Sequence, residues 1–116
     1  MAITDHFELE LIAARSAEAK GEVDVAFYHL ERAHILGQNT TRLHVQAHVR
    51  MLGWAWRQRD RHQFLGQLFR IAGAATKTFV GLVPRGNSGG TNVSPFKPMP
   101  IPEDLEAIME QSLRHS

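Results

Sequence analysis

The sequence predicts an all-α protein in which two antiparallel helical hairpins form a four-helix core, followed by a long extended Gly/Pro loop and a short C-terminal helix. Two observations predict this class. Apolar residues recur at helical spacing in five segments, and Gly, Asn or Asp stands at most of the boundaries between them. All five prolines fall within residues 81–102, where glycines are also frequent, so this stretch cannot form a regular element. We expect residues 1–116 to form a single helical domain.

The expected helices cover about residues 5–20, 22–36, 41–59, 61–76 and 103–114, and the extended loop covers 81–102. Gly21 separates the first two helices. The second helix is predicted to end at Gly37 in the left-handed conformation common at helix C-termini, and Asn39–Thr41 supplies the next N-cap. Asp60 is placed to cap the fourth helix. The third helix carries apolar side chains around much of its circumference, so we expect it to be the most buried.

The two halves of the predicted core repeat each other. Residues 19–33 align with residues 58–72 at a spacing of about 39 residues, with small side chains at matching points. Small side chains allow two helices to approach closely, as they do in tetratricopeptide hairpins. Two hairpins are too few for a long solenoid, so the sequence predicts a compact, tetratricopeptide-like four-helix core.

Composition excludes several functional classes. The formal net charge is +1, so no global field attracts nucleic acid or an anionic membrane. The chain contains no cysteine, which excludes disulfides, thiolate metal sites and a cysteine nucleophile. It shows neither a signal-peptide pattern nor an apolar run approaching the roughly 20 residues that span a bilayer, so we expect a cytoplasmic protein without membrane insertion. No G-x-S-x-G elbow supports hydrolase chemistry.

Four of the seven histidines lie close together in the sequence, within residues 26–51. His44 and His48 are four residues apart, so they share one helix face and can bind one metal ion. The turn before residue 41 folds the third helix back on the second, so His34 is expected to face His44, and His29 to approach His48. Neutral imidazoles suit Zn, Cu, Ni or Co, which makes His44, His48, His34 and His29 the predicted metal ligands.

Two other interpretations of these histidines stay open. Buried imidazoles often hydrogen-bond to backbone carbonyls or carboxylates without any ligand, and some transfer protons. In that case the protein fits an adaptor that binds a protein partner, or a dimer, with Trp54, Trp56 and Arg57 as candidates for an exposed contact surface. Imidazoles that converge within about 4–5 Å would favour the metal site, because Zn–N bonds are near 2.0–2.1 Å. An exposed aromatic surface without a polar pocket would favour the adaptor.

The Gly/Pro loop offers a weaker candidate site. Arg85, Gly86, Asn87, Gly89 and Gly90 can form a nest of backbone N–H groups that binds an anion, although the P-loop spacing is missing and a simple turn is the alternative. An enzyme acting on a small anionic ligand under this loop is therefore a third hypothesis, which the sequence favours less than the other two. The alternating prolines of residues 95–102 favour an extended path that packs along the helices.

Several runs make the chain similar to a family of small bacterial proteins that carries only a domain-of-unknown-function label. They are HLERAHILGQ, H-x-x-x-H-x-x-ML, LGQLFRIAGA and G-x-V-P-x-GNSGG-x-x-V-S-x-F-x-PMPIP-x-DL, and together they extend over about residues 6–110. The matching positions include His29, Glu31, His34, His44, His48, Gln67, Gly86, Asn87, Gly89 and Gly90. Ser88 stands where the family pattern has Thr, and His62-Gln63 stands where it has an acidic residue.

The resemblance implies a metal-linked role, because genes for such proteins often lie beside heavy-metal resistance and efflux genes. The sequence and the resemblance together predict a small cytoplasmic accessory protein of metal homeostasis. It would bind a transition metal through the helix histidines.

Overall fold

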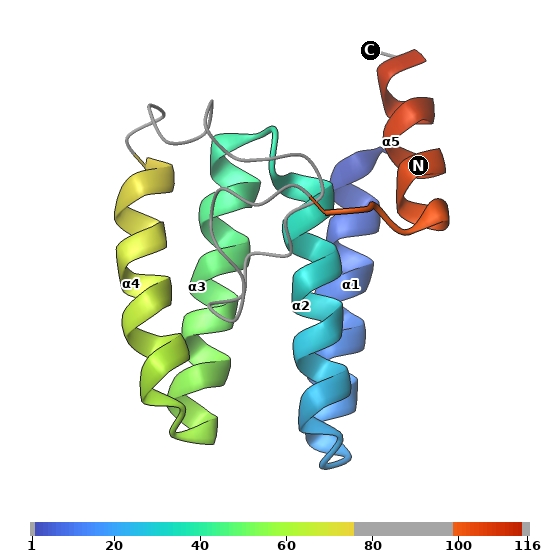
Figure 1. Ribbon diagram of the computed structural model, residues 1–116. Helices are drawn as coiled ribbons and strands as arrows, with labels where there is room; N and C mark the ends of the chain where they lie inside the picture. Colours follow the sequence, from blue (N-terminus) through green and yellow to red (C-terminus); the bar gives the residue numbers. More distant parts are fainter. Residues whose placement is uncertain (1, 76–98, 115–116) are drawn as a thin grey trace.

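The computed structural model describes residues 2–75 and 99–114, and Figure 1 shows their arrangement. The described residues form helices and no strands. The five helices are α1 (Ile3–Ala19), α2 (Val23–Gly37), α3 (Thr41–Gln58), α4 (Arg61–Ala75) and α5 (Glu103–Arg114). The predicted all-α class is confirmed. Most of the expected extended loop, including its glycine-rich part, lies outside the described residues.

Helices α1 to α4 run alternately up and down, and each packs against the next one in the chain (Figure 1). Helix α5 lies beside α1 and α2, at the end of the molecule farthest from α4. The antiparallel order follows from the short connections, because two or three residues cannot carry the chain anywhere but back along the preceding helix. The closer likeness to tetratricopeptide packing stays a prediction.

The main core lies among α1, α2 and α3, where large apolar side chains alternate with alanines. Its buried members are Phe7, Leu11, Ala14, Ala17, Ala26, Phe27, Leu30, Ala33, Leu43, Ala47, Met51, Trp54 and Ala55. Trp54 is buried against Phe27, and its indole N–H donates to the carbonyl of Val23 at 2.9 Å. A smaller cluster joins α5 to α2, with Leu105 and Met109 against Ile35 and Leu36. Ile101, at the end of the Gly/Pro stretch, packs against this second cluster.

The turn between α2 and α3 depends on Gly37, but not in the way the sequence predicts. Gly37 is the last residue of α2, and Gly21 is the described glycine with a positive φ, of +80°. The prediction of a left-handed Gly37 was therefore wrong. A Cβ at Gly37 would lie 2.7 Å from the Cβ of Leu43 and 3.2 Å from the ring of Phe7. The missing side chain allows α3 to begin directly against α2.

The turn between α3 and α4 sets which face of α4 meets α3. Arg59 takes a left-handed conformation, with φ of 57°, and the Asp60 carboxylate accepts the backbone N–H of Gln63 at 3.0 Å. The predicted Asp60 cap is confirmed. Gln63 and Gln67 are consequently buried on the α3 side of α4, whereas Leu65 and Phe69 point outward and are exposed. Nowhere in the described parts of the chain does a helix combine the length and apolar character needed to cross a membrane.

Candidate metal centre

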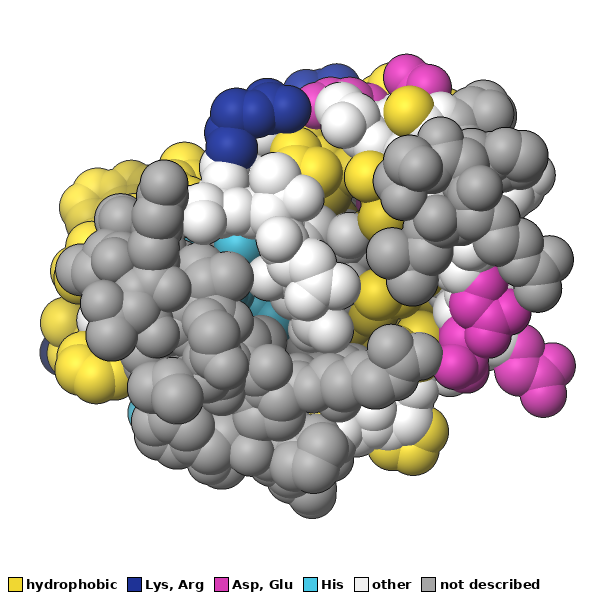
Figure 2. All heavy atoms as spheres, turned by 90° about the horizontal axis from the view of Figure 1, so that it is seen from above, with side chains coloured by type: hydrophobic (Ala, Val, Ile, Leu, Met, Phe, Trp, Pro, Cys, Tyr) yellow, Lys and Arg dark blue, Asp and Glu magenta, His cyan; other side chains and the backbone are white. Residues whose placement is uncertain are grey.

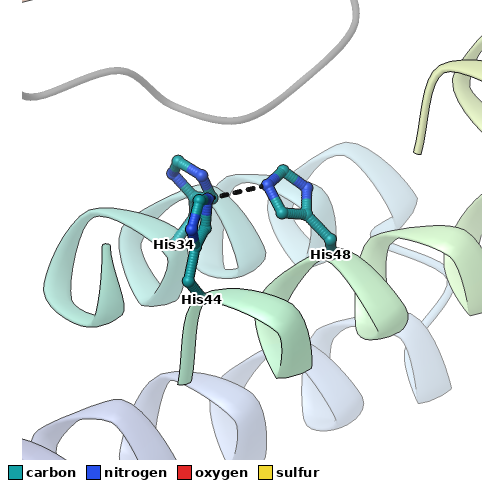
Figure 3. Close-up of side chains that lie close together, drawn as sticks. All are labelled: His34, His44 and His48. Atoms are coloured by element: carbon teal, nitrogen blue, oxygen red, sulfur yellow. Dashed lines mark hydrogen bonds between the residues drawn. The ribbon is translucent and has the colours of Figure 1, made fainter. Parts of the chain in front are cut away.

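Three histidines from two helices converge in the interior of the molecule. His34 comes from α2, and His44 and His48 come from α3 (Figure 3). The ring centroids lie 4.7 to 4.9 Å apart in all three pairs. The three side chains are only 2, 1 and 2% exposed. One ring nitrogen from each residue lies within 4.8 Å of the other two, which is a spacing that can hold a metal ion.

The local sequence explains the convergence. His44 and His48 are one turn apart on α3, so both rings project from the same face (Figure 3). His34 stands one turn before the end of α2, at a similar height to the start of α3. The close approach that Gly37 permits between the two helices brings the His34 ring against the other two.

Gln67 of α4 fixes the orientation of His48. The Nδ1 atom of His48 lies 2.5 Å from the Oε1 atom of Gln67, which is fully buried. A carbonyl oxygen only accepts, so Nδ1 carries the proton and the lone pair of Nε2 faces the other rings. The Gln67 amide in turn donates to Oε1 of Gln63 at 3.3 Å. Metal-binding histidines are commonly held by such a hydrogen bond on their second ring nitrogen.

The contact between His44 and His48 fits both a metal-free and a metal-bound state. Their Nε2 atoms are 3.1 Å apart, which allows His44 to donate Nε2–H to the lone pair of His48. Two nitrogens bound tetrahedrally at about 2.0–2.1 Å from one Zn ion would be about 3.4 Å apart. Because these two separations are similar, a metal ion could replace the shared hydrogen with little movement of the two rings. The other ring nitrogen of His44, Nδ1, is buried and has no hydrogen-bond partner among the described residues.

Both α3 histidines are held neutral. Burial lowers the pKa of His44 from 6.5 to about 4. Burial also lowers the pKa of His48 to about 3, where the Gln67 hydrogen bond acts in the opposite direction and the charges of His44 and Arg70 add to the lowering. Neutral imidazole is the form that binds a metal ion, so neither ring needs to lose a proton to become a ligand near pH 7.

The structure does not bring His29 into this cluster. His29 lies five residues before His34, so it projects about 140° away around α2. Its Nδ1 atom is 2.8 Å from Oε1 of Glu10 on α1, and the other oxygen of Glu10 accepts Nε–H of Arg32 at 3.0 Å. The guanidinium of Arg32 continues to Asp104 of α5. His29 therefore belongs to an ion-pair network that joins α1, α2 and α5.

Two other side chains near these histidines in the sequence could offer a donor atom, but neither is part of the three-histidine group. Met51 is fully buried in the apolar core, and Glu31 is partly buried on α2. The candidate anion loop, Arg85, Gly86, Asn87, Gly89 and Gly90, lies outside the described residues. The role of Gln67 was not predicted from the sequence. Its signal was a polar residue on the buried face of α4.

One comparison with known proteins is informative here. The family model described as "Protein of unknown function (DUF3703)" matches residues 1–109. The chain belongs to this family. The sequence-based resemblance to an uncharacterised family is thereby confirmed, and the matched range of this DUF3703 protein contains all three converging histidines and Gln67. Comparison with curated proteins and comparison with solved structures gave no match.

Proposed function

We propose that this DUF3703 protein binds one transition metal ion through His34, His44 and His48, as a small cytoplasmic accessory protein of metal homeostasis. The convergence of three buried imidazoles within 4.8 Å of one another carries the proposal. Imidazoles that converge within about 4–5 Å favour a metal site over a structural role, because Zn–N bonds are near 2.0–2.1 Å.

The chemistry of the ligand set supports the same conclusion. Burying a polar ring is costly unless its nitrogens find partners, and a metal ion would satisfy one nitrogen on each of the three rings at once. Gln67 supplies the outer hydrogen bond that keeps one lone pair of His48 directed inward. Three protein ligands leave one coordination position open, which is typical of sites that bind a further ligand or exchange their metal.

Nitrogen ligands narrow the class of metal. Imidazole suits Zn, Cu, Ni and Co, whereas Mg and Ca prefer oxygen ligands, which the three-histidine group does not provide. The link to metal homeostasis comes from the resemblance to a family whose genes often lie beside heavy-metal resistance genes.

Isothermal titration of the chelator-stripped, tag-free protein with Zn(II), Cu(II), Ni(II) and Co(II) tests the proposal. We expect binding of one ion per chain to the native protein, and its loss in His44→Ala and in His48→Ala. His62→Ala is the matched control, because His62 is an exposed histidine on α4 and its loss should leave the affinity unchanged. Circular dichroism shows whether each variant is folded. Absence of binding to folded native protein would overturn the proposal.

A second candidate function, the protein–protein adaptor, is favoured by a groove between α1 and α3. The groove has a volume of about 390 Å³, and its lining includes Arg15, Arg50 and Arg57 against the single acid Glu18. This charge fits an acidic segment of a protein partner. Of the aromatic residues considered for such a surface, Trp54 is buried, whereas Trp56 is 71% exposed at the far end of α3.

The groove can be tested independently of the metal. A fluorescent acidic peptide should bind to the native protein with an affinity that falls as salt is raised, and Arg15→Glu/Arg50→Glu should abolish that binding. The matched change Arg42→Glu, at an exposed position of α3 outside the groove lining, should have little effect. Equal binding by both variants would exclude the groove as the docking site.

A further inference from the structure

The three-histidine cluster brings no negative charge to a metal ion that it binds. His34, His44 and His48 are imidazole donors, and no carboxylate belongs to their group. All 12 Asp and Glu residues of the chain lie within the described residues, so this holds for every acidic side chain of the protein. The chain has no cysteine, so no thiolate can supply the charge either. An ion held by these three rings would keep its full formal charge.

The hydrogen-bond partner behind His48 is uncharged as well. In zinc sites a ligating histidine often donates its second N–H group to a carboxylate, which places negative charge close to the ion. Here that partner is the amide of Gln67, and the next side chain in the chain of hydrogen bonds is the amide of Gln63. Figure 2 shows the same separation on the upper face of the molecule, where the visible acidic side chains lie at the margins, apart from the histidine atoms near the middle.

Burial makes this lack of negative charge selective. The three histidines are only 1–2% exposed, so bulk water is not in contact with most of the site. The cost of moving an ion from water into a medium of low dielectric constant rises with the square of its charge, so it is about four times larger for a divalent ion than for a monovalent ion of equal size. The site therefore favours an ion with a single positive charge.

We infer that the three-histidine site is selective for the monovalent copper ion, Cu(I), over divalent metal ions. The inference rests on the proposed metal site and names the ion that fits it. Imidazole is a suitable ligand for copper, and Cu(I), with its filled d shell, is commonly complete with a trigonal set of three ligands. Zn(II) takes four ligands, so three histidines leave its shell one ligand short. Divalent ions bind the same rings, but more weakly than Cu(I).

Competition titrations of the tag-free protein under anaerobic conditions test this selectivity. Bicinchoninate serves as the competitor for Cu(I), and a chromophoric chelator of divalent ions serves for Cu(II) and Zn(II). We expect the native protein to bind Cu(I) at least about tenfold more tightly than Cu(II), and Zn(II) more weakly than either. A tenfold difference corresponds to a reduction potential of the bound copper about 59 mV above that of the aqueous Cu(II)/Cu(I) couple.

A pair of variants at His44 isolates the effect of charge. Glu and Gln have the same size, and each places a terminal oxygen at a distance from the backbone similar to that of the histidine Nε2 atom. The ratio of Cu(I) affinity to Cu(II) affinity should be at least about tenfold lower in His44→Glu than in His44→Gln, because the carboxylate offsets the second charge of Cu(II). Gln111→Glu adds the same charge at an exposed position of α5 and should leave the native ratio unchanged.

The outcomes separate this inference from the proposed function. Native protein that binds Cu(II) or Zn(II) as tightly as Cu(I) would overturn the selectivity and leave the metal site intact. Equal affinity ratios in the two His44 variants, each shown to be folded by circular dichroism, would also overturn it. The titrations of native protein need no substitution, so they decide the question even if a variant fails to fold. Absence of binding for all three ions would overturn both proposals.

Discussion

His29 and His34 stand five residues apart on one helix, yet they belong to two polar regions of opposite character. His29 is part of the ion-pair network, defined by Glu10, Arg32 and Asp104 in addition to His29 itself, at the junction of α1, α2 and α5. His34 is part of the uncharged, buried cluster with His44 and His48 between α2 and α3. The network pairs each described charge with an opposite one, whereas the cluster brings together three groups that can all act as ligands.

The difference shows that partners, not residue type, decide what a histidine does. A carboxylate beside His29 gives that ring a hydrogen-bond acceptor and makes it a link between helices. Burial keeps His44 and His48 neutral, and the hydrogen bond to Gln67 directs the Nε2 lone pair of His48 towards His44. The two regions should therefore respond differently to acid, to metal and to substitution.

Acid should produce the largest difference. The pKa of His44 and of His48 is lowered from 6.5 to about 4 and about 3, so the unfolded chain binds more protons than the folded protein below pH 6.5. The free energy of unfolding is thus highest above pH 6.5 and falls as the pH approaches 4, with a slope of about 1.4 kcal/mol per pH unit for each ring. Urea unfolding of the metal-free protein between pH 7.5 and 4.5 measures this loss.

The Arg32–Asp104 ion pair should contribute little in that range. The contact with Arg32 lowers the pKa of Asp104 below 3.8, so the stabilisation from this pair is present above pH 3.8 and is lost only at lower pH. The double variant His44→Gln/His48→Gln should flatten the pH dependence, and Asp104→Asn should not. A native protein whose stability stays constant from pH 7.5 to 4.5 would refute the neutral, buried state of the cluster.

Substitution of the two histidines of α2 should have different effects on metal affinity. His34→Ala removes one of three ligands, and we expect it to weaken Zn(II) binding by at least about 100-fold, as the loss of a first ligand costs several kcal/mol. His29→Ala removes a group outside the cluster and should change the affinity by less than about threefold. Competition titration with a chromophoric chelator measures both. Similar losses in the two variants would mean that His29 joins the metal site.

Gln67 should have a smaller effect than any ligand. Gln67→Leu removes the acceptor that fixes His48, and we expect Zn(II) affinity to fall by about 10–100-fold. Gln67→Glu keeps an acceptor for the Nδ1–H group and should retain the affinity. The ¹⁵N chemical shifts of His48 report the position of its proton, and they should show Nδ1–H in the native protein and a mixture of tautomers in Gln67→Leu. Unchanged shifts would remove the positioning role of Gln67.

The smallest effect is expected in the ion-pair network. The carboxylate of Asp104 is 60% exposed, so its pairing with Arg32 is screened by solvent. Asp104→Asn should lower the free energy of unfolding by no more than about 1 kcal/mol and leave Zn(II) affinity unchanged. Thermal unfolding and the same chelator competition check both parts. A large drop in metal affinity would show that the two regions are coupled through α2.

The sequence predicted the elements well because their signals are local. Apolar periodicity located the helices, and the Asp60 cap marked the start of α4. The spacing of His44 and His48 predicted their shared face, and the short α2–α3 turn predicted the approach of His34.

The features that the sequence did not predict depend on contacts between distant residues. Glu10 is 19 residues from His29, and Gln67 is 19 residues from His48, so neither pairing follows from spacing along one helix. Gly37 carried the signal of a helix end, but its importance comes from the proximity of Leu43 across the turn.

X-ray absorption spectroscopy of the Zn(II)-loaded protein would show whether the three histidines bind one ion, because outer-shell scattering reports how many imidazoles bind each ion. We expect one Zn per chain, a shell of nitrogen and oxygen ligands at about 2.0–2.1 Å, and scattering from three imidazoles. The signal of the His34→Ala variant should fit two imidazoles, and that of His29→Ala should still fit three. A native spectrum with no more than one imidazole per Zn would contradict the assignment of His34, His44 and His48 as a single metal site.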